Sequence, residues 1–519
     1  MYRTLAWTSL FFCLGVAYIH SNLTIDATLL SGFGMLCAGF TYIGTRLMVV
    51  DTWLFISKRT LKNSSLLILS LSLGISYAAH VYHQEQADWK ILMSQSVDKH
   101  DLTKVIGYID GYIQSTSWGE QMPLTVVYYL SAPNRKWMIA PGHPKVWLSV
   151  FGDGATMPTS LQSGDAVQTS LSLKTPIPGG FANALKRKGI GLEADTSLNK
   201  LQKLSTTMPA DPIAWQGLVQ QWLESRVIQA YGMTSAAFLL SFSIGDHMKL
   251  ASTLVATFVA MGVVHAVVAS GATIRMTVTP VVRYLIAHMT RRVQWLIVGV
   301  ALTIGMVFLT AFAPPATRAA IVYGYDLLAI YFRKPRDFFT SNAFSLAAMA
   351  VIQPEWLFDP GVIFSYAAAA AIHVLPQLFS STWFYRVKSL RMRKLISKAM
   401  ALQLGVSPFV AFEFGQFPYY SLIINLFLYP VLEWAIPIST LLLLLGCVNP
   451  LRMSFLRQFL DLVFIPLSNG LHVLSTHPLN LVFSPPPIWI EFAYLAVMIL
   501  SIWQIRRYNL RKISKYSNG

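Results

Sequence analysis

Polar residues interrupt several apolar segments of this chain, and the densest group lies in GVVHAVVASGATIRMTVTP, residues 262–280. About three helical turns of this stretch hold His265, the pair Ser270 and Gly271, and Arg275. An ionisable group at bilayer depth costs at least a few kcal/mol, so it is usually paired or lines a water-filled path. Further polar residues of apolar segments are Arg318, Asp326, Asn342, Asp359, Ser365, Asn425 and Glu433.

These residues do not form a recognisable catalytic set. His265 and Ser270 are five residues apart, which places them about 140° apart around a helix, and the G-x-S-x-G turn of serine hydrolases is missing. The sequence also has no G-x-x-x-x-G-K-[ST] phosphate loop and no H-E-x-x-H or H-x-H-x-D-H cluster. We therefore expect neither catalytic residues, nor a metal site, nor a cofactor.

Two of the polar residues have ordinary structural alternatives. Arg318 follows Pro314 and Pro315, which suit the first turn of a helix, so it is either a cation at the mouth of a span or a snorkelling side chain. Asp359 precedes Pro360 and Gly361 in a turn, and a role in capping the next helix is favoured over catalysis.

The elements that position these residues are membrane helices. Of the 519 residues, 54% are hydrophobic and 12% are charged, and the mean hydropathy is +0.50. Apolar runs of about 17–25 residues recur, and runs of that length span a bilayer as helices. We predict a polytopic α-helical membrane protein with roughly ten membrane helices. Most of the formal net charge of +17 is ascribed to basic loops on the cytoplasmic side.

The order of segments predicts five parts. Residues 1–85 hold three membrane helices, expected near 4–19, 27–49 and 65–81, and residues 88–200 form an extracytoplasmic β domain. Residues 205–230 form an interfacial amphipathic helix with Trp215, Leu218, Val219, Trp222, Leu223 and Val227 on one face. Residues 231–505 form the main helical membrane domain, and residues 506–519 a basic cytoplasmic tail. The basic residues near position 58 place both chain ends in the cytoplasm.

The β domain is predicted from runs of β-branched and aromatic residues between turn residues. The runs are KVIGYIDGYI, LTVVYYL, KVWLSVF and DAVQTSLSL. Four or five short strands suit a small Greek-key barrel such as an OB-fold, with a β-sandwich as the alternative.

Several motifs in the same order resemble those of the ComEC-type competence proteins. GVVHAVVASG is similar to the family pattern G-x-x-H-x-x-x-x-S-G, and PPATRAA to P-x-x-R-A. WLFDPGVIFSYAAAAAI resembles L-x-D-P-G-x-x-x-S-x-x-A, and GQFPYYSLIINLFLYPVL resembles Q-x-x-x-x-S-x-x-x-N-L-x-x-x-P. LQSGDAVQ and GGFANALKRKGIG resemble elements around the family's OB-fold, so the resemblance covers about residues 100–445. Many relatives carry a C-terminal metallo-β-lactamase-like nuclease domain, and we expect a form without it.

The resemblance implies a bacterial inner-membrane channel that moves single-stranded DNA into the cytoplasm during natural transformation. The expected pore residues are His265, Ser270, Gly271, Arg275, Arg318, Asp359, Ser365 and Asn425. In the β domain, stacking rings and basic residues are expected to contact DNA. These candidates are Lys104, Arg135, Lys136, Lys145, Lys186, Arg187, Lys188, Trp118, Trp137 and Trp147.

The resemblance also implies partners, namely membrane lipid, a separate DNA receptor, a nuclease and a cytoplasmic ATPase motor. Two alternatives stay open at this point: a secondary transporter for a small anionic solute, and an intramembrane hydrolase. Inverted repeats would favour the transporter, and none is recognisable in the sequence.

Overall fold

The computed structural model divides the chain into two compact units. One unit contains residues 1–223 and 324–357, and the other contains residues 224–323 and 358–519. The residues that the structure describes are 2–20, 52–53, 56–94, 103–110, 113–116, 119–130, 136–140, 142–151, 161–177, 182, 185–186, 188–205, 212–246, 250–263, 267–268, 271–289, 291–382, 389–414, 416–417, 421–475 and 481–482.

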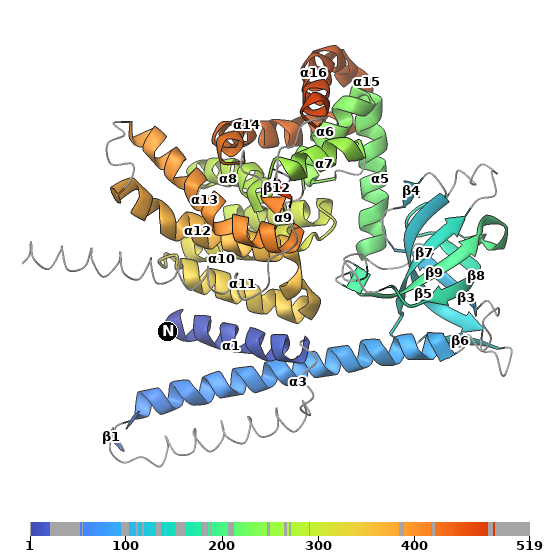
Figure 1. Cartoon of the computed structure of the whole chain (residues 1–519), viewed down its shortest axis with the longest axis horizontal. Helices are drawn as coiled ribbons and strands as arrows, with labels where there is room; N and C mark the ends of the chain where they lie inside the picture. Colours follow the sequence, from blue (N-terminus) through green and yellow to red (C-terminus); the bar gives the residue numbers. More distant parts are fainter. Residues whose placement is uncertain are drawn as a thin grey trace, which may run out of the picture. The chain divides into compact units, whose positions relative to one another are not determined.

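In the described part of the first unit, three long helices pack together. Helix α1 (Tyr2–His20) packs along α3 (Lys58–Ser94) and against α11 (Phe338–Ile352), and Figure 1 shows α1 and α3 side by side. Glycines allow the close approach of α1 and α3, since a β-carbon on Gly15 would lie 2.3 Å from the Leu71 carbonyl oxygen. The predicted second segment, 27–49, lies outside the described residues.

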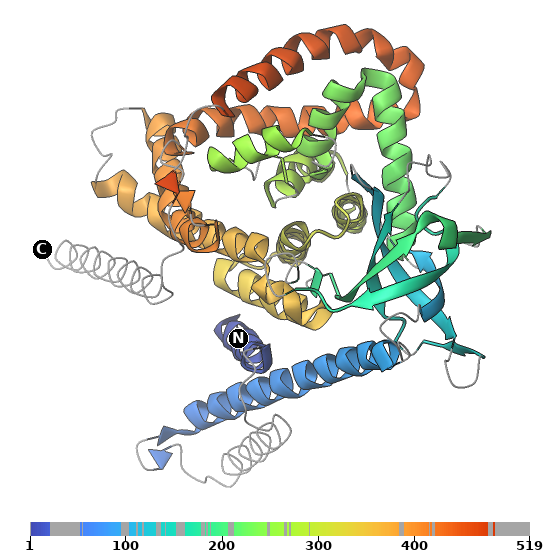
Figure 2. The same ribbon diagram turned by 45° about the vertical axis from the view of Figure 1, so that its right-hand side comes forward.

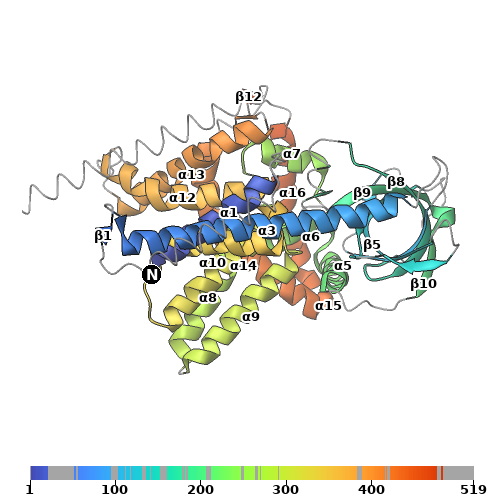
Figure 3. The ribbon, with the colours of Figure 1, turned by 90° about the horizontal axis from the view of Figure 1, so that it is seen from below.

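The β domain is a closed five-stranded barrel with short additional strands. The barrel consists of β3 (Thr103–Ile109), β5 (Gly119–Leu130), β7 (Lys145–Phe151), β9 (Ile190–Ser197) and β8 (Ala166–Lys174), paired in that order and closed by β8 against β3. The β7–β9 pair is parallel and the others are antiparallel. Figure 3 shows the barrel at one end of α3. The additional strands are β4 (Gln114–Thr116), β6 (Trp137–Ile139) and β10 (Gln202–Ser205).

The barrel core is apolar, as the alternating sequence predicts. Val105, Leu124, Val126, Leu148 and Val167 are fully buried within one cluster, because alternate residues of each strand point inward. The predicted run KVWLSVF coincides with β7, and DAVQTSLSL nearly coincides with β8. The core therefore follows directly from the period-two pattern of the strands.

Helix α3 is longer than the predicted membrane segment and ends in the barrel. It continues to Ser94, and Leu92 is buried in the barrel core. Gly191 of β9 leaves room for the Trp89 ring, because a β-carbon there would lie 2.1 Å from that ring. The first barrel strand thus begins at Thr103 and not near residue 88, because Trp89 and Leu92 of α3 pack against the barrel core while still helical.

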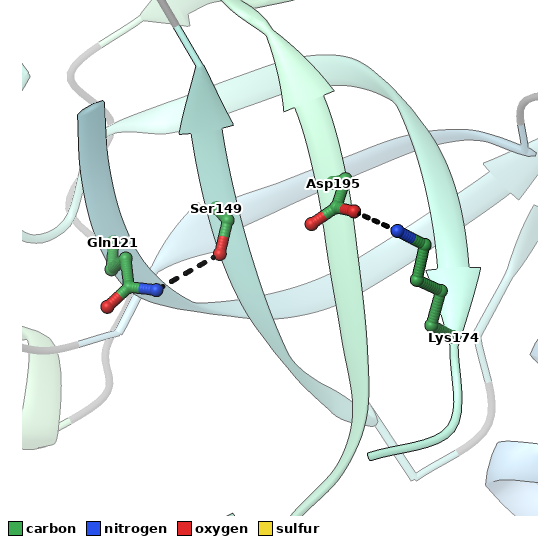
Figure 4. A network of polar contacts seen from close by, with 4 residues as sticks. All are labelled: Gln121, Ser149, Lys174 and Asp195. Atoms are coloured by element: carbon green, nitrogen blue, oxygen red, sulfur yellow. Dashed lines mark hydrogen bonds and ion pairs between the residues drawn. The ribbon is translucent and has the colours of Figure 1, made fainter. Parts of the chain in front are cut away.

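Polar pairs connect neighbouring strands on the barrel. Lys174 forms an ion pair with Asp195, and Gln121 donates a hydrogen bond to Ser149 over 3.3 Å (Figure 4). Thr169 and Thr196 hydroxyls share a buried hydrogen bond of 2.9 Å. These contacts join β8 to β9 and β5 to β7, which fixes strand register.

The second unit is helical. Its helices are α6 (Met233–Ile244), α7 (Ser252–Ala260), α8 (Gly271–His288), α9 (Arg292–Leu309), α12 (Pro360–Thr382), α13 (Leu390–Phe414), α14 (Ser421–Val448), α15 (Pro450–Met453) and α16 (Arg457–Ser475). The unit boundaries fall inside α5 (Pro212–Tyr231) and α10 (Pro314–Tyr331). Helix α6 packs against α14 and α16 (Figure 2). Short elements complete the chain: β1 (Thr52–Trp53) with β2 (Ile56–Ser57), β11 (Gln416–Phe417) with β12 (Leu481–Val482), and the 3-10 turns η1 (Leu198–Lys200), η3 (Pro354–Phe358) and η4 (Ser454–Leu456).

Helix α5 covers most of the predicted interfacial helix, but its apolar residues do not share one face. Leu223 and Val227 are buried, whereas Trp215 and Trp222 are exposed. The cause is the 100° advance per residue, which separates Trp222 from Leu223. The buried side carries Gln216, whose amide donates a 2.9 Å hydrogen bond to Gln220. The interfacial position of this helix stays a prediction.

Three helices in the described part of the chain are long and apolar enough to cross a membrane, namely 66–93, 292–309 and 431–448. Shorter apolar helices lie at 7–17, 233–244, 338–352 and 360–373. The chain is therefore mostly helical with several membrane-length segments, and the total of ten stays a prediction.

Candidate functional site

The candidate site is centred on Arg318, in the second turn of α10. A tight connection precedes the helix: Ala311 and Phe312 both adopt φ of 53°, in the left-handed region that side chains rarely occupy. The Thr317 hydroxyl donates hydrogen bonds to the Phe312 and Ala313 carbonyls, at 3.2 and 3.1 Å. The Thr317 side chain therefore ties the first turn of α10 to the connection that precedes Pro314.

Arg318 is buried among the beginnings of two other helices. Only 8% of its surface is exposed, and its guanidinium carbon lies 4.9 Å from the centre of the Tyr366 ring in α12. A cation placed over an aromatic face is attracted to the ring. A β-carbon on Gly271, at the start of α8, would lie 3.4 Å from Arg318 Nη2, 3.0 Å from Ala319 Cβ and 4.0 Å from Ser365 Oγ. Gly271 therefore allows α8 to approach Ala319 of α10 closely, right beside the guanidinium group.

The beginnings of α8, α10 and α12 meet at this place. Beside the Gly271 contacts, a β-carbon on Gly361 of α12 would lie 2.8 Å from Pro315 Cγ of α10. Asp359 accepts a 3.1 Å hydrogen bond from the Val362 amide, which confirms its predicted capping role. We name the group of Gly271, Arg318, Ser365 and Tyr366 the Arg318 site.

The charges near the Arg318 site are mostly positive. A helix N-terminus acts as roughly half a positive charge, so the starts of α8 and α12 add to the guanidinium group, whereas Pro314 and Pro315 give the start of α10 no N–H donors. Arg275, on the exposed side of α8, is close enough to act electrostatically on Arg318. The Asp359 carboxylate opposes these charges at the start of α12. Helix N-termini and arginine together suit phosphate or another anion.

The structure brings some of the predicted pore residues together. Gly271, Arg318 and Ser365 lie in contact distance, although 94 residues of sequence separate the first from the last (365 − 271 = 94). Asn425 is buried in α14, and the contacts described for the Arg318 site do not include it. His265 and Ser270 lie outside the described residues. Tyr366 was not among the predicted residues, since a ring-to-cation contact between two helices leaves no periodic signal in the sequence.

The residues of the barrel that were predicted to contact DNA differ in their exposure and in their ion pairs. Lys104, Lys136, Trp137 and Lys186 are exposed. Lys145 instead forms a 2.5 Å ion pair with Asp110, whose side chain is fully buried. Trp118, Arg135 and Arg187 lie outside the described residues.

Trp147 is a core residue of the barrel and not a surface ring. It is 5% exposed and packs with Leu185 and Ile190. The Lys188 ammonium lies 5.5 Å from the centre of this ring, and partial loss of water lowers the pKa of Lys188. Trp147 therefore lies beside Lys188 but is too buried for a DNA base to stack on its ring.

In the described part of the chain, no three His, Cys, Asp or Glu side chains are grouped so that they could hold a metal ion. The two described cysteines, Cys13 and Cys447, are free and buried.

Membrane-length helices, a closed β-barrel and a buried arginine among helix N-termini define a membrane protein with an anion-compatible site. Residues 242–508 match the family model described as competence protein, which is just over half of the chain. The chain therefore belongs to the competence protein family, as its motifs indicated. No curated protein and no solved structure matches the chain. The family suggests a role in DNA uptake for transformation.

Proposed function

We propose that this protein is a channel that passes single-stranded DNA through the bacterial inner membrane during natural transformation. The observation that carries the proposal is the Arg318 site, which lies within the family match and combines a buried arginine with the N-termini of α8 and α12. A DNA strand carries one negative charge per nucleotide. Contacts with the Arg318 site would offset part of the free-energy cost of removing water from each phosphate.

The Arg318 site lowers a local barrier and does not drive transport. Moving one charge against 100 mV costs roughly 2.3 kcal/mol, and this cost repeats with every nucleotide that enters a negative cytoplasm. The sequence has no phosphate-loop motif. We therefore assign the pulling force to a separate cytoplasmic ATPase, and strand degradation and capture to a separate nuclease and DNA receptor.

The barrel is assigned to the extracytoplasmic side, where it receives the strand. Its closed five-stranded order, with one parallel pair, supports an OB-fold, a fold that often binds oligonucleotides. Both chain ends would be cytoplasmic, since basic residues cluster near position 58 and in the tail. A reporter that is active only outside the cytoplasm, fused at residue 117, tests this topology.

Substitution of Arg318 tests the channel proposal in cells. Arg318→Gln should lower transformation by about 10- to 150-fold, because a charge-assisted contact contributes roughly 1.5–3 kcal/mol. Arg318→Lys should retain part of the activity, since a point charge still meets a phosphate without the paired geometry of guanidinium.

Two controls separate transport from folding and DNA capture. Arg283→Gln removes an exposed arginine of the same unit and should transform normally. Protein level in the membrane and DNA uptake into the periplasm should stay unchanged in all three variants. Normal transformation by Arg318→Gln at normal protein level contradicts the role of the Arg318 site.

A further inference from the structure

Strand β6 exposes apolar side chains on both of its faces. Trp137 is 41% exposed, Met138 45% and Ile139 66%. Because alternate residues of a strand point to opposite faces, Met138 lies on the other face from its two neighbours. Antiparallel strands at a protein surface usually carry apolar residues on one face only. Apolar exposure on both faces therefore indicates an interaction surface.

Strand β6 is also an edge strand. In the described part of the barrel it pairs with β5 alone, where Tyr128 lies opposite Ile139. Tyr128 is 40% exposed and extends the apolar surface onto β5. Proteins protect exposed edges with charged residues, with proline or with a covering element, and β6 itself holds neither a charge nor a proline. Its apolar side chains therefore need an environment that covers them.

Strand β6 lies at the end of the barrel that α3 enters. Gly142, shortly after β6, lies against the Asp88 carboxylate of α3 and leaves no room for a β-carbon between them. Ala140, directly after β6, shares the barrel core with Leu92 of α3. Figure 1 shows β6 beside the end of α3. The position of β6 is therefore tied to that of Asp88.

Helix α3 brings this end of the barrel to a membrane surface. Its residues 66–93 are long and apolar enough to cross a bilayer. A helix crosses the hydrocarbon core in about 20 residues, so a span that begins at Leu66 reaches the edge of the core within a few residues of Asp88. Strand β6 is therefore at the level of the lipid headgroups, whichever side of the membrane the barrel occupies.

We propose that β6 docks on the lipid bilayer from which α3 emerges. Trp137 and Ile139 enter the boundary between headgroups and acyl chains, which tryptophan favours because its ring is apolar and its N–H is polar. Lys136, which is exposed directly before β6, contacts the phosphates of anionic lipids. The insertion is shallow, because the backbone groups of an edge strand need water or headgroups as partners. The barrel is then held at two points, α3 and β6.

A bilayer fits β6 better than a nucleic acid or a protein does. Met138 and Ile139 have no ring on which a base could stack. A protein partner of ordinary interface size covers about 20–30 residues a side, far more than this strand offers. One tryptophan beside aliphatic residues and a lysine is instead typical of segments that lie in the membrane interface. This docking does not depend on the proposed function.

Lipid contact is measured on the full-length protein in lipid nanodiscs of phosphatidylcholine mixed with phosphatidylglycerol. One fluorophore is attached to Ile139→Cys, with the native cysteines replaced by serine. The matched control carries it on Phe151→Cys, because Phe151 is 43% exposed and pairs with Gly119 at the other end of β5. A lipid with a spin label near its headgroup should quench the fluorophore at position 139, and iodide in the water should quench it little. Position 151 should show the reverse.

Three variants, read with the fluorophore at position 139, separate docking from misfolding. Trp137→Ser/Met138→Ser should lower the ratio of docked to free β6 about 10-fold, because less apolar area leaves the water. Trp137→Phe/Met138→Leu keeps apolar side chains and should dock nearly as the wild type does. Lys136→Gln should weaken the lipid quenching in nanodiscs that contain phosphatidylglycerol, but not in nanodiscs of phosphatidylcholine alone.

The outcomes distinguish this inference from other roles of β6 and from the channel proposal. Equal quenching at positions 139 and 151 would overturn the docking. Lipid quenching that Trp137→Ser/Met138→Ser leaves unchanged would overturn it too. Protection of position 139 from iodide only after single-stranded DNA is added, without lipid quenching, would assign β6 to DNA and overturn the docking as well. Each of these results leaves the channel proposal standing, because the Arg318 variants test that proposal separately.

Discussion

The barrel and the Arg318 site handle positive charge in opposite ways. In the barrel, Lys145 and Lys203 are held by aspartates, while Lys104, Lys136 and Lys186 are exposed. In the helical unit, Arg318 is buried against a tyrosine ring among helix N-termini. An exposed lysine is fully hydrated before it meets a phosphate, whereas a buried arginine is held in place beforehand.

This difference indicates a division of labour. A surface that captures a moving strand needs many weak, salt-sensitive contacts. A narrow passage through a membrane needs few charges, each fixed in position, because the low dielectric there strengthens every electrostatic contact. The following predictions test whether the two regions differ as this division requires.

The largest expected effect concerns a lysine that the barrel needs for folding. Lys145→Gln should destabilise the protein by about 3–5 kcal/mol, because the Asp110 carboxylate would be left buried without its cation. Thermal unfolding of the full-length protein in detergent measures this loss. Adding Asp110→Asn should restore part of the stability, and the single variant Lys136→Gln should unfold like the wild type. Equal stability of Lys145→Gln and wild type would show that the pair is not structural.

The next effect concerns the space at Gly271. Gly271→Ala places a methyl group 3.0 Å from Ala319 Cβ, which is tighter than a normal contact, so α8 and α10 have to move apart beside Arg318. Transformation should fall about 10-fold, since overpacking of this kind costs about 1–3 kcal/mol. Gly305→Ala is the matched control, because a β-carbon there meets nothing within 4 Å. Equal transformation by the two variants would argue against a role for this contact.

A smaller effect is expected at Tyr366. Tyr366→Leu removes the ring beneath Arg318 and should lower transformation roughly 2- to 30-fold, because a cation–π contact contributes about 0.5–2 kcal/mol. Tyr366→Phe keeps the ring and should transform nearly normally. A defect of Tyr366→Phe as large as that of Tyr366→Leu would assign the role to the hydroxyl group instead.

The smallest effect is pH-dependent and concerns the exposed Lys174–Asp195 pair. The hydrogen bond from Lys174 to Asp195, and the attraction of the two charges, raise the pKa of Lys174. The pair therefore stabilises the folded barrel below the pKa of an unfolded lysine, and this contribution disappears as pH rises through the raised pKa. Its size is under about 1 kcal/mol because the pair is exposed. The Tm difference between wild type and Asp195→Asn should shrink as the pH rises past the ordinary pKa of lysine, about 10.4, and a constant difference would contradict this account.

The sequence predicted the elements better than their contacts. Strand β7 follows from alternation in KVWLSVF, and the capping by Asp359 follows from its place before Pro360. The family motifs also selected Gly271, Arg318 and Ser365 before their proximity was known.

The sequence did not predict features that depend on three-dimensional packing. The end of α3 at Ser94 depends on Trp89 and Leu92 entering the barrel, and a hydropathy pattern stops at the membrane boundary. The burial of Trp147 depends on the short segment around Leu185 that covers it. Alternation identifies the faces of a strand, but not which face another segment covers.

Water access to Ser365 tests the central claim most directly, because a DNA path must be hydrated whereas a packed core is not. Ser365→Cys, with the native cysteines replaced by serine, is treated with a charged, membrane-impermeant thiol reagent. Ile304→Cys, on the exposed apolar side of α9, is the matched control. The account predicts that Ser365→Cys reacts, that DNA held in transit slows this reaction, and that Ile304→Cys stays unmodified. A cysteine at position 365 that is as unreactive as the one at position 304, or that reacts equally with and without DNA, would contradict the claim that the strand passes the Arg318 site.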